Sequence, residues 1–307
     1  METALCSGQE LLAWRRRQLL RGGRAADLDW LLAMEGNLSW AELQRLRIMP
    51  ESTAALDSTL LDLESLWSRH LRNHIPLQHL VGRCPWRDFD LQISPAALIP
   101  RQETELLIDF ALDCLQDHDE GGCISTGLWA DLGTGSGALA VALARALPEW
   151  HGHAVDASTA ALALARINLN NLTKCGIWQL HQGSWWDPLA PWWGQFDLVV
   201  ANPPYIPSQI VEALDPLVRD HEPRLALCGG EDGLESCRTI VERAPLALSP
   251  GGWLLLEHHH DQSDQVLGLM GSVGLVSCKP RSDLRGVKRF AIGRRSPDAE
   301  AVPRSLP

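Results

Sequence analysis

The stretch Asp131-Leu132-Gly133-Thr134-Gly135-Ser136-Gly137 separates two segments of different character. Residues 128–130 before it are apolar enough for a short strand, and the alanine-rich residues 138–144 after it are good helix formers. Glycines in such a loop permit positive φ angles and let a ligand approach the backbone closely. The stretch therefore predicts a strand, a glycine loop and a helix, which together form the first unit of an α/β fold.

A second unit follows and ends on a carboxylate. Residues 153–155 are typical of a strand that ends at Asp156, and Ser158-Thr159 opens another helix. Asp156 follows Gly133 by roughly the 20 residues expected in a nucleotide-type cofactor site, where a carboxylate can accept both hydroxyls of a ribose. The loop alone fits an NAD fingerprint with Ala138 in its third position, the loop of S-adenosylmethionine (AdoMet) methyltransferases, or a tight structural turn.

The segment Asn202-Pro203-Pro204-Tyr205 decides between these alternatives. It follows an apolar run, Phe196–Ala201, which is typical of a buried strand. Two prolines must end the pairing of that strand because proline has no N–H. An asparagine amide, an unused Pro203 carbonyl and the Tyr205 ring would then lie at the carboxyl end of the strand and suit a planar –NH2 group. A plain strand-ending turn is the alternative, but with the glycine loop upstream the pattern favours methyl transfer over hydride transfer.

Composition restricts the class of protein. The chain has 307 residues, 45% of them hydrophobic and 21% charged, which is ordinary for a globular protein with two domains. Its net charge of −11 argues against direct nucleic-acid binding. The eight cysteines lack paired spacing, the amino terminus lacks a signal-peptide pattern, and no apolar run reaches the length of a membrane span. We therefore expect a cytoplasmic, monomeric protein that does not bind membranes.

Four regions are expected along the chain. Residues 1–74 predict a small all-helical domain, with helices at Gln9–Leu20, Asp27–Met34, from a capping box at Ser39, and from Thr53 to His70. Residues 75–99 predict a β-hairpin linker that includes 80–82 as an extended segment. Residues 100–293 predict a doubly wound α/β domain, and residues 294–307 a disordered tail.

Three consecutive histidines, His258–His260, follow a predicted strand at 253–257. Alternate side chains of a strand point to opposite faces, and no second cluster of ligands lies nearby in sequence. We therefore expect an exposed strand end here and no metal site.

The ordered set of motifs resembles the peptide-chain release-factor glutamine N(5)-methyltransferases, the HemK/PrmC family, over residues 75 to 292. Single motifs of this set recur widely, whereas their order is specific. The matching motifs are Leu98–Glu105, the glycine loop, Asp156, Phe196–Pro207, His221-Glu222-Pro223, Gly229–Leu234, and Pro250-Gly251-Gly252 before a strand that ends in Glu257.

The resemblance implies a Rossmann-like, seven-stranded AdoMet-dependent methyltransferase sheet with a helical domain that helps dock the substrate. The cofactor would be AdoMet, and the substrate the glutamine of the Gly-Gly-Gln motif in peptide chain release factors. Gly133–Gly137 would face the methionine part of AdoMet, Asp156 the ribose hydroxyls, and Trp185 the adenine, while Asn202 would sit beside the methyl group. Ser184 stands where the family often has an acidic residue.

The hypothetical mechanism needs alignment more than it needs a base. The Asn202 side-chain oxygen and the Pro203 carbonyl would each accept one N–H of the substrate amide, and Tyr205 would pack against the amide plane. Pro204 completes the predicted substrate contacts. The alternatives are a ribosomal-protein glutamine methyltransferase, a methyltransferase of exocyclic amines in nucleic acid, and a non-catalytic AdoMet-binding or NAD-binding regulator, which would have no use for the acceptor pair.

Overall fold

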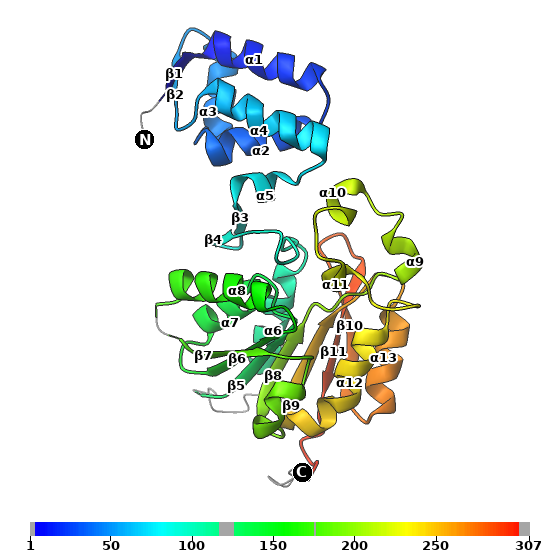
Figure 1. Ribbon diagram of the computed structural model, residues 1–307. Coiled ribbons are helices and arrows are strands. Elements are labelled where there is room, and N and C mark those ends of the chain that lie inside the picture. The colour runs from blue at the N-terminus through cyan, green and yellow to red at the C-terminus, as the bar shows by residue number, and fades with distance from the viewer. Residues whose placement is uncertain (1–3, 117–125, 175, 301–307) are drawn as a thin grey trace. The chain divides into compact units, whose positions relative to one another are not determined.

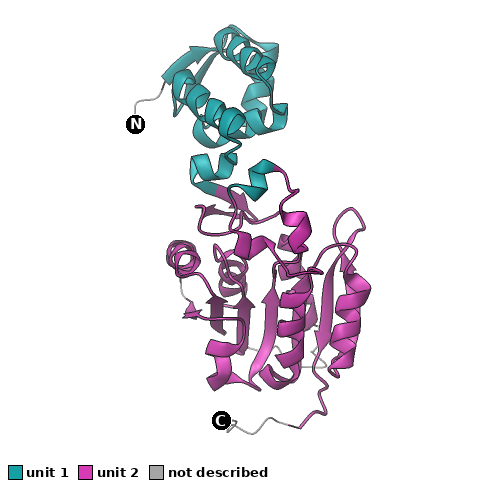
Figure 2. Ribbon diagram, turned by 45° about the vertical axis from the view of Figure 1, so that its right-hand side comes forward, with its two compact units in different colours: residues 1–83, 216–221 teal, residues 84–215, 222–307 magenta. Residues whose placement is uncertain are grey.

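The computed structural model describes residues 4–116, 126–174 and 176–300. The chain divides into two compact units, coloured separately in Figure 2. The smaller unit comprises the chain up to Arg83 together with residues 216–221, and the larger unit comprises residues 84–215 and the chain from Glu222 onward. Within the described residues, no helix is both long enough and apolar enough to cross a membrane.

The smaller unit is built mainly from helices. Ser39 forms the predicted capping box with Glu42, which confirms that helix start. Trp14 and Trp67 lie in its core, packed among leucines of several helices. Its inserted segment is held by His221, whose Nε2 lies 2.9 Å from the Asn73 carbonyl oxygen. The helices are α1 (Gly8–Leu20), α2 (Ala25–Glu35), α3 (Trp40–Ile48), α4 (Leu60–Asn73), α5 (Leu77–Val81) and α10 (Pro216–Arg219).

Two local predictions for this region are wrong. Residues Thr53–Leu56 form strand β2, which pairs antiparallel with β1 (Ala4–Ser7), so the predicted helix from Thr53 begins only at Leu60. Alternate burial of residues 53–56 suits a strand, and Thr59 caps α4 by accepting from the Asp62 N–H. Residues 77–81 are helical where residues 80–82 were predicted to be extended, and the helix ends at Gly82.

The larger unit contains the predicted hairpin and a seven-stranded sheet (Figure 1). The hairpin pairs β3 (Arg83–Trp86) with β4 (Phe89–Gln92). The sheet has the order β10-β11-β9-β8-β5-β6-β7, with parallel pairing from β9 to β7 and antiparallel pairing of β11 with both neighbours. Its strands are β5 (Leu128–Leu132), β6 (His151–Asp156), β7 (Ile177–Gln182), β8 (Phe196–Ala201), β9 (Leu248–Glu257), β10 (Val276–Ser282) and β11 (Lys288–Arg294).

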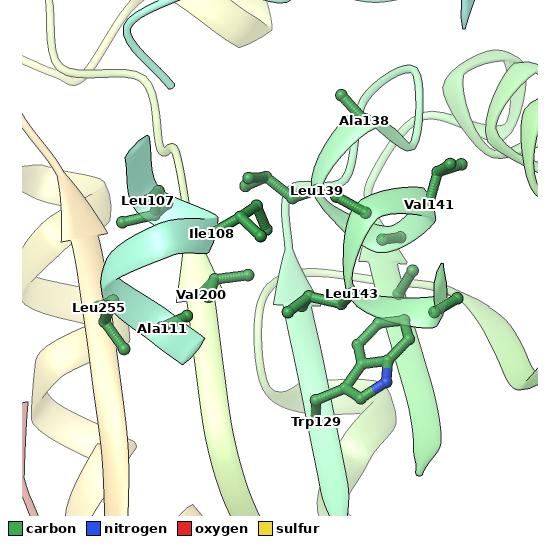
Figure 3. Packing of buried hydrophobic residues seen from close by; sticks show 14 of the residues in the cluster. Leu107, Ile108, Ala111, Trp129, Ala138, Leu139, Val141, Leu143, Val200 and Leu255 are labelled. Carbon is green, nitrogen blue, oxygen red and sulfur yellow. The ribbon is translucent and has the colours of Figure 1, made fainter. Parts of the chain in front are cut away.

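Helices cover both faces of the sheet, and strand residues alternate between the two cores. Leu198 and Val200 of β8 pack with α6, α7 and α8, whereas Val199 and Ala201 pack with α12 and α13. Figure 3 shows Val200 together with residues of α6 and α7. A parallel sheet covered on both faces explains why β8 is apolar throughout. The helices of this unit are α6 (Glu105–Gln116), α7 (Ala138–Ala146), α8 (Thr159–Leu172), α9 (Ser208–Val211), α11 (Arg224–Leu227), α12 (Glu235–Ala247) and α13 (Ser263–Ser272), with a 3₁₀ turn η1 (Asp187–Trp192).

The start of the predicted disordered tail is part of the sheet. Arg294 is the last residue of β11, and the buried Arg295 donates from Nη1 to the Leu248 carbonyl at 2.6 Å. The proline, serine and charged residues from 294 onward favour disorder by their composition, but the Arg295 guanidinium is satisfied by the backbone carbonyls of Leu248 and Glu300. Residues 301–307 of the predicted tail lie outside the described residues.

Candidate active site

The glycine loop between β5 and α7 has the backbone shape that its sequence predicts. Gly133, Gly135 and Gly137 all have positive φ, at 77°, 55° and 84°, a region that other residues rarely adopt. The N–H groups of Gly133 and Thr134 both donate to the Val155 carbonyl at 2.9 Å, which fixes the loop to the end of β6. The loop backbone is thus shaped by glycine and anchored by the neighbouring strand.

A buried carboxyl group at the end of β5 forms a hydrogen bond with this loop. Asp131, at the end of β5, is fully buried and accepts from the Thr134 hydroxyl at 2.6 Å. Burial raises the pKa of Asp131 to about 7, and the nearby Asp156 carboxylate adds to the rise. Thr134 was predicted to bind cofactor, and its side chain holds Asp131, a residue to which sequence reasoning assigned no role.

Asp156 lies at the end of β6, as predicted, and links two elements. One carboxylate oxygen accepts from the Gly135 N–H at 2.9 Å and the other from the Ser158 N–H at 2.8 Å. Each oxygen has further lone pairs, so both can also accept from a ligand hydroxyl. Asp156 therefore joins the glycine loop to the start of α8.

Asn168 on α8 was missed by the sequence reasoning. Its buried amide donates to the Ser136 carbonyl at 2.8 Å and to the Gln92 carbonyl at 3.0 Å, and it accepts from the Gln92 N–H at 2.8 Å. A polar residue within a helix does not reveal such contacts in the sequence. Asn168 joins the hairpin strand β4 to the glycine loop.

A cavity of about 430 Å³ opens beside the loop. Trp185 lies against Gly133, since a Cβ at that glycine would be 3.1 Å from the indole ring. Trp185 itself has a φ of 47°, which is unusual for a bulky residue and marks local backbone strain beside the loop. Of the predicted site residues, the cavity is lined by Gly133, Thr134, Gly135, Ser136, Asp156, Trp185, Asn202 and Pro204.

Three predicted site residues do not line this cavity. Gly137 is the N-cap of α7 and packs against Ala165, where a Cβ would approach within 3.1 Å. Pro203 is buried two residues after the end of β8, and Tyr205 is partly buried beyond it. Burial, followed by the charge of Glu257, raises the pKa of the Tyr205 phenol to about 12, so it stays neutral.

The Asn202 side chain is held by a chain of two hydrogen bonds. Its Nδ2 donates to the Thr104 hydroxyl at 3.2 Å, and that hydroxyl donates to a Glu257 carboxyl oxygen at 2.7 Å. Among the residues that the structure describes, none donates a hydrogen bond to Asn202 Oδ1 or to the Pro203 carbonyl. Asn202 Oδ1, on a residue that lines the cavity, is thus left for a ligand, and the Pro203 carbonyl is also unused, although Pro203 itself does not line the cavity.

The chain after the prolines is packed against a second glycine segment, Gly229–Leu234. Ile206 pairs with Cys228, and a Cβ at Gly229 would lie 2.6 Å from the Pro204 carbonyl oxygen. A Cβ at Gly233 would lie 2.3 Å from the Tyr205 carbonyl oxygen. These glycines therefore allow close backbone approach, which explains a motif whose role the sequence left open.

Gln262, also missed by the sequence reasoning, completes this contact. Its Nε2 donates to the Tyr205 carbonyl at 3.0 Å and to the Gly233 carbonyl at 3.3 Å. An ion pair of 2.6 Å between Arg101 and the buried Glu222 joins two further motifs. Motifs far apart in the chain thus converge around the segment after β8.

The histidine run only partly fits its prediction. His258 is buried, with its N–H donating to the Arg289 carbonyl at 2.9 Å, so the exposed strand end predicted there is wrong for this residue. His260 is exposed, and His259 pairs with Asp261 at 2.6 Å. No group of three or more His, Cys, Asp or Glu residues in the described chain is arranged to hold a metal ion.

A seven-stranded sheet with an antiparallel β11, a glycine loop after β5 and a carboxylate after β6 is the fold of Rossmann-like AdoMet-dependent methyltransferases. A family model described as "Methyltransferase small domain" matches residues 108–229. The solved hMettl16 catalytic domain in complex with MAT2A 3'UTR hairpin 6 has this fold too, with a TM-score of 0.50 and 16% identity over 69% of this chain and 77% of that chain.

Curated relatives define the family. A release factor glutamine methyltransferase of Prochlorococcus marinus is 57% identical over 94% of this chain and 97% of its own length. One of Synechocystis sp. is 37% identical over 96% of this chain and 99% of its own, and one of Gloeobacter violaceus is 42% identical over 87% and 90%. The chain belongs to the release factor glutamine methyltransferases.

Proposed function

We propose that the chain transfers a methyl group from AdoMet to the side-chain amide nitrogen of the glutamine in the Gly-Gly-Gln motif of translation release factors. The observation that carries this proposal is the pair of unused acceptors, Asn202 Oδ1 and the Pro203 carbonyl. Because Asn202 Nδ2 donates to Thr104, the amide oxygen is the group left for substrate. The activity named for the relatives agrees with such a pair.

The residues around the cavity fit AdoMet. Positive φ angles at Gly133 and Gly135 leave the loop backbone open to a ligand, and we assign the loop Gly133–Gly137 to the methionine part, with Gly137 starting α7 and the other four residues lining the cavity. The Asp156 carboxylate suits the ribose hydroxyls, and the Trp185 ring offers a flat surface for adenine. Asn202 would lie beside the transferred methyl. Bound AdoMet supplies a methyl group activated by its sulfonium.

The residues would act by orientation and hydrogen bonding. An amide nitrogen is a weak nucleophile because its lone pair is delocalised, so placing it in line with the methyl and sulfur is the main requirement. Asn202 Oδ1 and the Pro203 carbonyl would each accept one N–H, which favours the positive charge that develops on nitrogen. Tyr205, whose phenol is neutral at physiological pH and has its pKa raised further by burial, would pack against the amide plane. No base is required before transfer, because the proton leaves afterwards.

The smaller unit would help dock the release factor. This assignment rests on the resemblance to release factor glutamine methyltransferases, which implies a docking role for a helical unit of this size. The net charge of −11 supports a protein substrate over nucleic acid. We infer that the enzyme works as a monomer in the cytoplasm.

A radiolabelled-methyl transfer assay tests the proposal. Purified chain and AdoMet are offered an unmodified release factor, a release factor with its Gly-Gly-Gln glutamine replaced, ribosomal protein, and total RNA and DNA. Label on the intact release factor alone is expected. Label on ribosomal protein or on nucleic acid would overturn the substrate assignment.

Replacing Asn202 tests the acceptor pair within the same assay. Asn202→Ala is expected to lower turnover by about 10²-fold, the size of effect typical of losing one oriented polar group at the reacting centre. AdoMet affinity, measured by calorimetry, should stay within a few fold because the glycine loop and Asp156 are untouched. Full turnover in this variant would contradict the proposed role of the amide.

A further inference from the structure

We propose that Thr104 and Glu257 are positioning residues that hold the Asn202 amide with its oxygen directed at the substrate. This inference deepens the proposed function and rests on it for the identity of the substrate. Neither residue was expected in the site from the sequence. They act through Asn202, and neither is placed in contact with the substrate.

The direction of the hydrogen bonds determines which way the amide points. A threonine hydroxyl has one proton, and here that proton is donated to Glu257 Oε2 at 2.7 Å. The Thr104 oxygen can then only accept from Asn202, so the atom 3.2 Å away must be the Asn202 nitrogen. The amide oxygen is left on the other side, free of any donor in the described chain.

Burial makes this arrangement stiff. Thr104 is 4% exposed and Glu257 is 2% exposed, so water does not compete for their hydrogen bonds. Glu257 is the last residue of β9, which is paired on both sides, with β8 and with β11. The central strand β9 therefore fixes the Glu257 carboxyl. The carboxyl in turn orients the Thr104 hydroxyl, and the hydroxyl orients the Asn202 amide.

The ionisation state of Glu257 controls which group donates and which accepts in the hydrogen bonds that link Glu257, Thr104 and Asn202. Burial raises the pKa of Glu257 to about 7 against the lowering effects of Thr104 and Arg289. The other charges that act on it are Glu103 and Arg101, which precede α6. When Glu257 is protonated, its O–H can donate to Thr104, whose own proton is then free to turn toward Asn202 and favour the opposite amide orientation.

Thr104 also lines the cavity, so a direct contact with AdoMet is the competing explanation. The variants Thr104→Val and Thr104→Ser separate the two roles, because valine has nearly the same shape without the hydroxyl and serine retains it. Thr173→Val is the matched control. Thr173 donates its hydroxyl to the Leu169 carbonyl at 2.6 Å at the end of α8, and it does not line the cavity.

Single-turnover and steady-state kinetics with the release factor give the first test. Thr104→Val is expected to lower kcat about tenfold, as loss of one buried hydrogen bond predicts, with the AdoMet dissociation constant within about twofold of wild type. Thr104→Ser and Thr173→Val should both stay near wild type. An unchanged kcat in Thr104→Val, or a parallel loss of AdoMet affinity, would overturn the positioning role.

The pH profile tests Glu257. In wild type, kcat is expected to fall as pH drops below about 7, and Glu257→Gln should flatten this acidic limb because the side chain no longer titrates. An acidic limb of unchanged position in Glu257→Gln would contradict the role of Glu257.

A readout without substrate separates this inference from the proposed function. The side-chain NH2 signals of Asn202, identified in a ¹⁵N-asparagine sample by their loss in Asn202→Asp, report the bond to Thr104. They should shift in Thr104→Val but not in Thr173→Val. If wild type fails to methylate release factors while these shifts occur, the proposed function is wrong and the positioning role of Thr104 and Glu257 stands. If the shifts are absent, the positioning role itself is rejected.

Discussion

Replacing Gly233 by alanine is expected to perturb the candidate active site without touching any group that lines the cavity. The new Cβ would lie 2.3 Å from the Tyr205 carbonyl oxygen, whereas real Cβ contacts essentially never fall below 3.0 Å, so about 0.7 Å of backbone displacement is required. The φ of +78° adds a conformational cost of about 1 kcal/mol for a residue with a side chain. Overpacking of this kind adds roughly 2 kcal/mol, giving about 3 kcal/mol in total.

Gly274→Ala is the matched control for this variant. Gly274 has a φ of +84° and nothing within 4 Å of its added Cβ, so it carries the same conformational cost without the clash. Calorimetric unfolding of the full chain should show a loss of about 1 kcal/mol for Gly274→Ala and about 3 kcal/mol for Gly233→Ala.

Methyl transfer completes the comparison. The displaced Tyr205 carbonyl lies only three residues from Asn202, so Gly233→Ala is expected to lower turnover by up to about 10²-fold, as misplacement near 1 Å does in other enzymes. Gly274→Ala should keep wild-type turnover. If the two variants lose equal stability and both remain fully active, the close approach of Gly233 to Tyr205 has no mechanical role and the reasoning fails.

Three further predictions concern the larger unit. Asp156→Ala is expected to weaken AdoMet binding at least about tenfold by calorimetry, because a charged acceptor is removed, and unchanged affinity would contradict the ribose assignment. Gly152→Ala would place a Cβ 2.0 Å from the buried Trp129 ring and should cost roughly 1–3 kcal/mol in unfolding free energy, whereas Gly271→Ala, a helical site with nothing within 4 Å, should cost nothing. The pKa of Glu257 is raised from 4.5 to about 7 on folding, so protonated Glu257 stabilises the folded state. This contribution to the unfolding free energy is fully present below pH 4.5 and is lost as pH rises through 7. Relative to Glu257→Gln, wild type should therefore lose about 3 kcal/mol of unfolding free energy between pH 4.5 and 8, and a pH-independent difference would refute this.

Sequence reasoning succeeded where short-range rules act. The glycine loop, the carboxylate at Asp156 and the strand before Asn202 each depend on neighbours within a few residues, and all three lie where they were predicted. Prolines and glycines carry their conformational preference with them. The seven-stranded sheet was implied by the family resemblance, which rests on the order of the motifs.

The missed features depend on partners far away in the chain. Thr104 and Glu257 are separated by 153 positions, and Gln262 contacts Tyr205 across 57. The strand at 53–56 exists because it pairs with residues 4–7, and no local propensity announces that pairing. Side-chain hydrogen bonds across such distances leave no periodic signal in one sequence.

The Asn168 amide joins two structures that the chain builds separately. One side chain satisfies both the N–H and the C=O of Gln92 in the hairpin and also the carbonyl of Ser136 in the glycine loop. If either the hairpin or the loop opens, the buried Asn168 amide loses hydrogen bonds that water does not replace. The hairpin and the loop therefore form one cooperative unit, and any ligand that orders the loop also stabilises the hairpin against local unfolding.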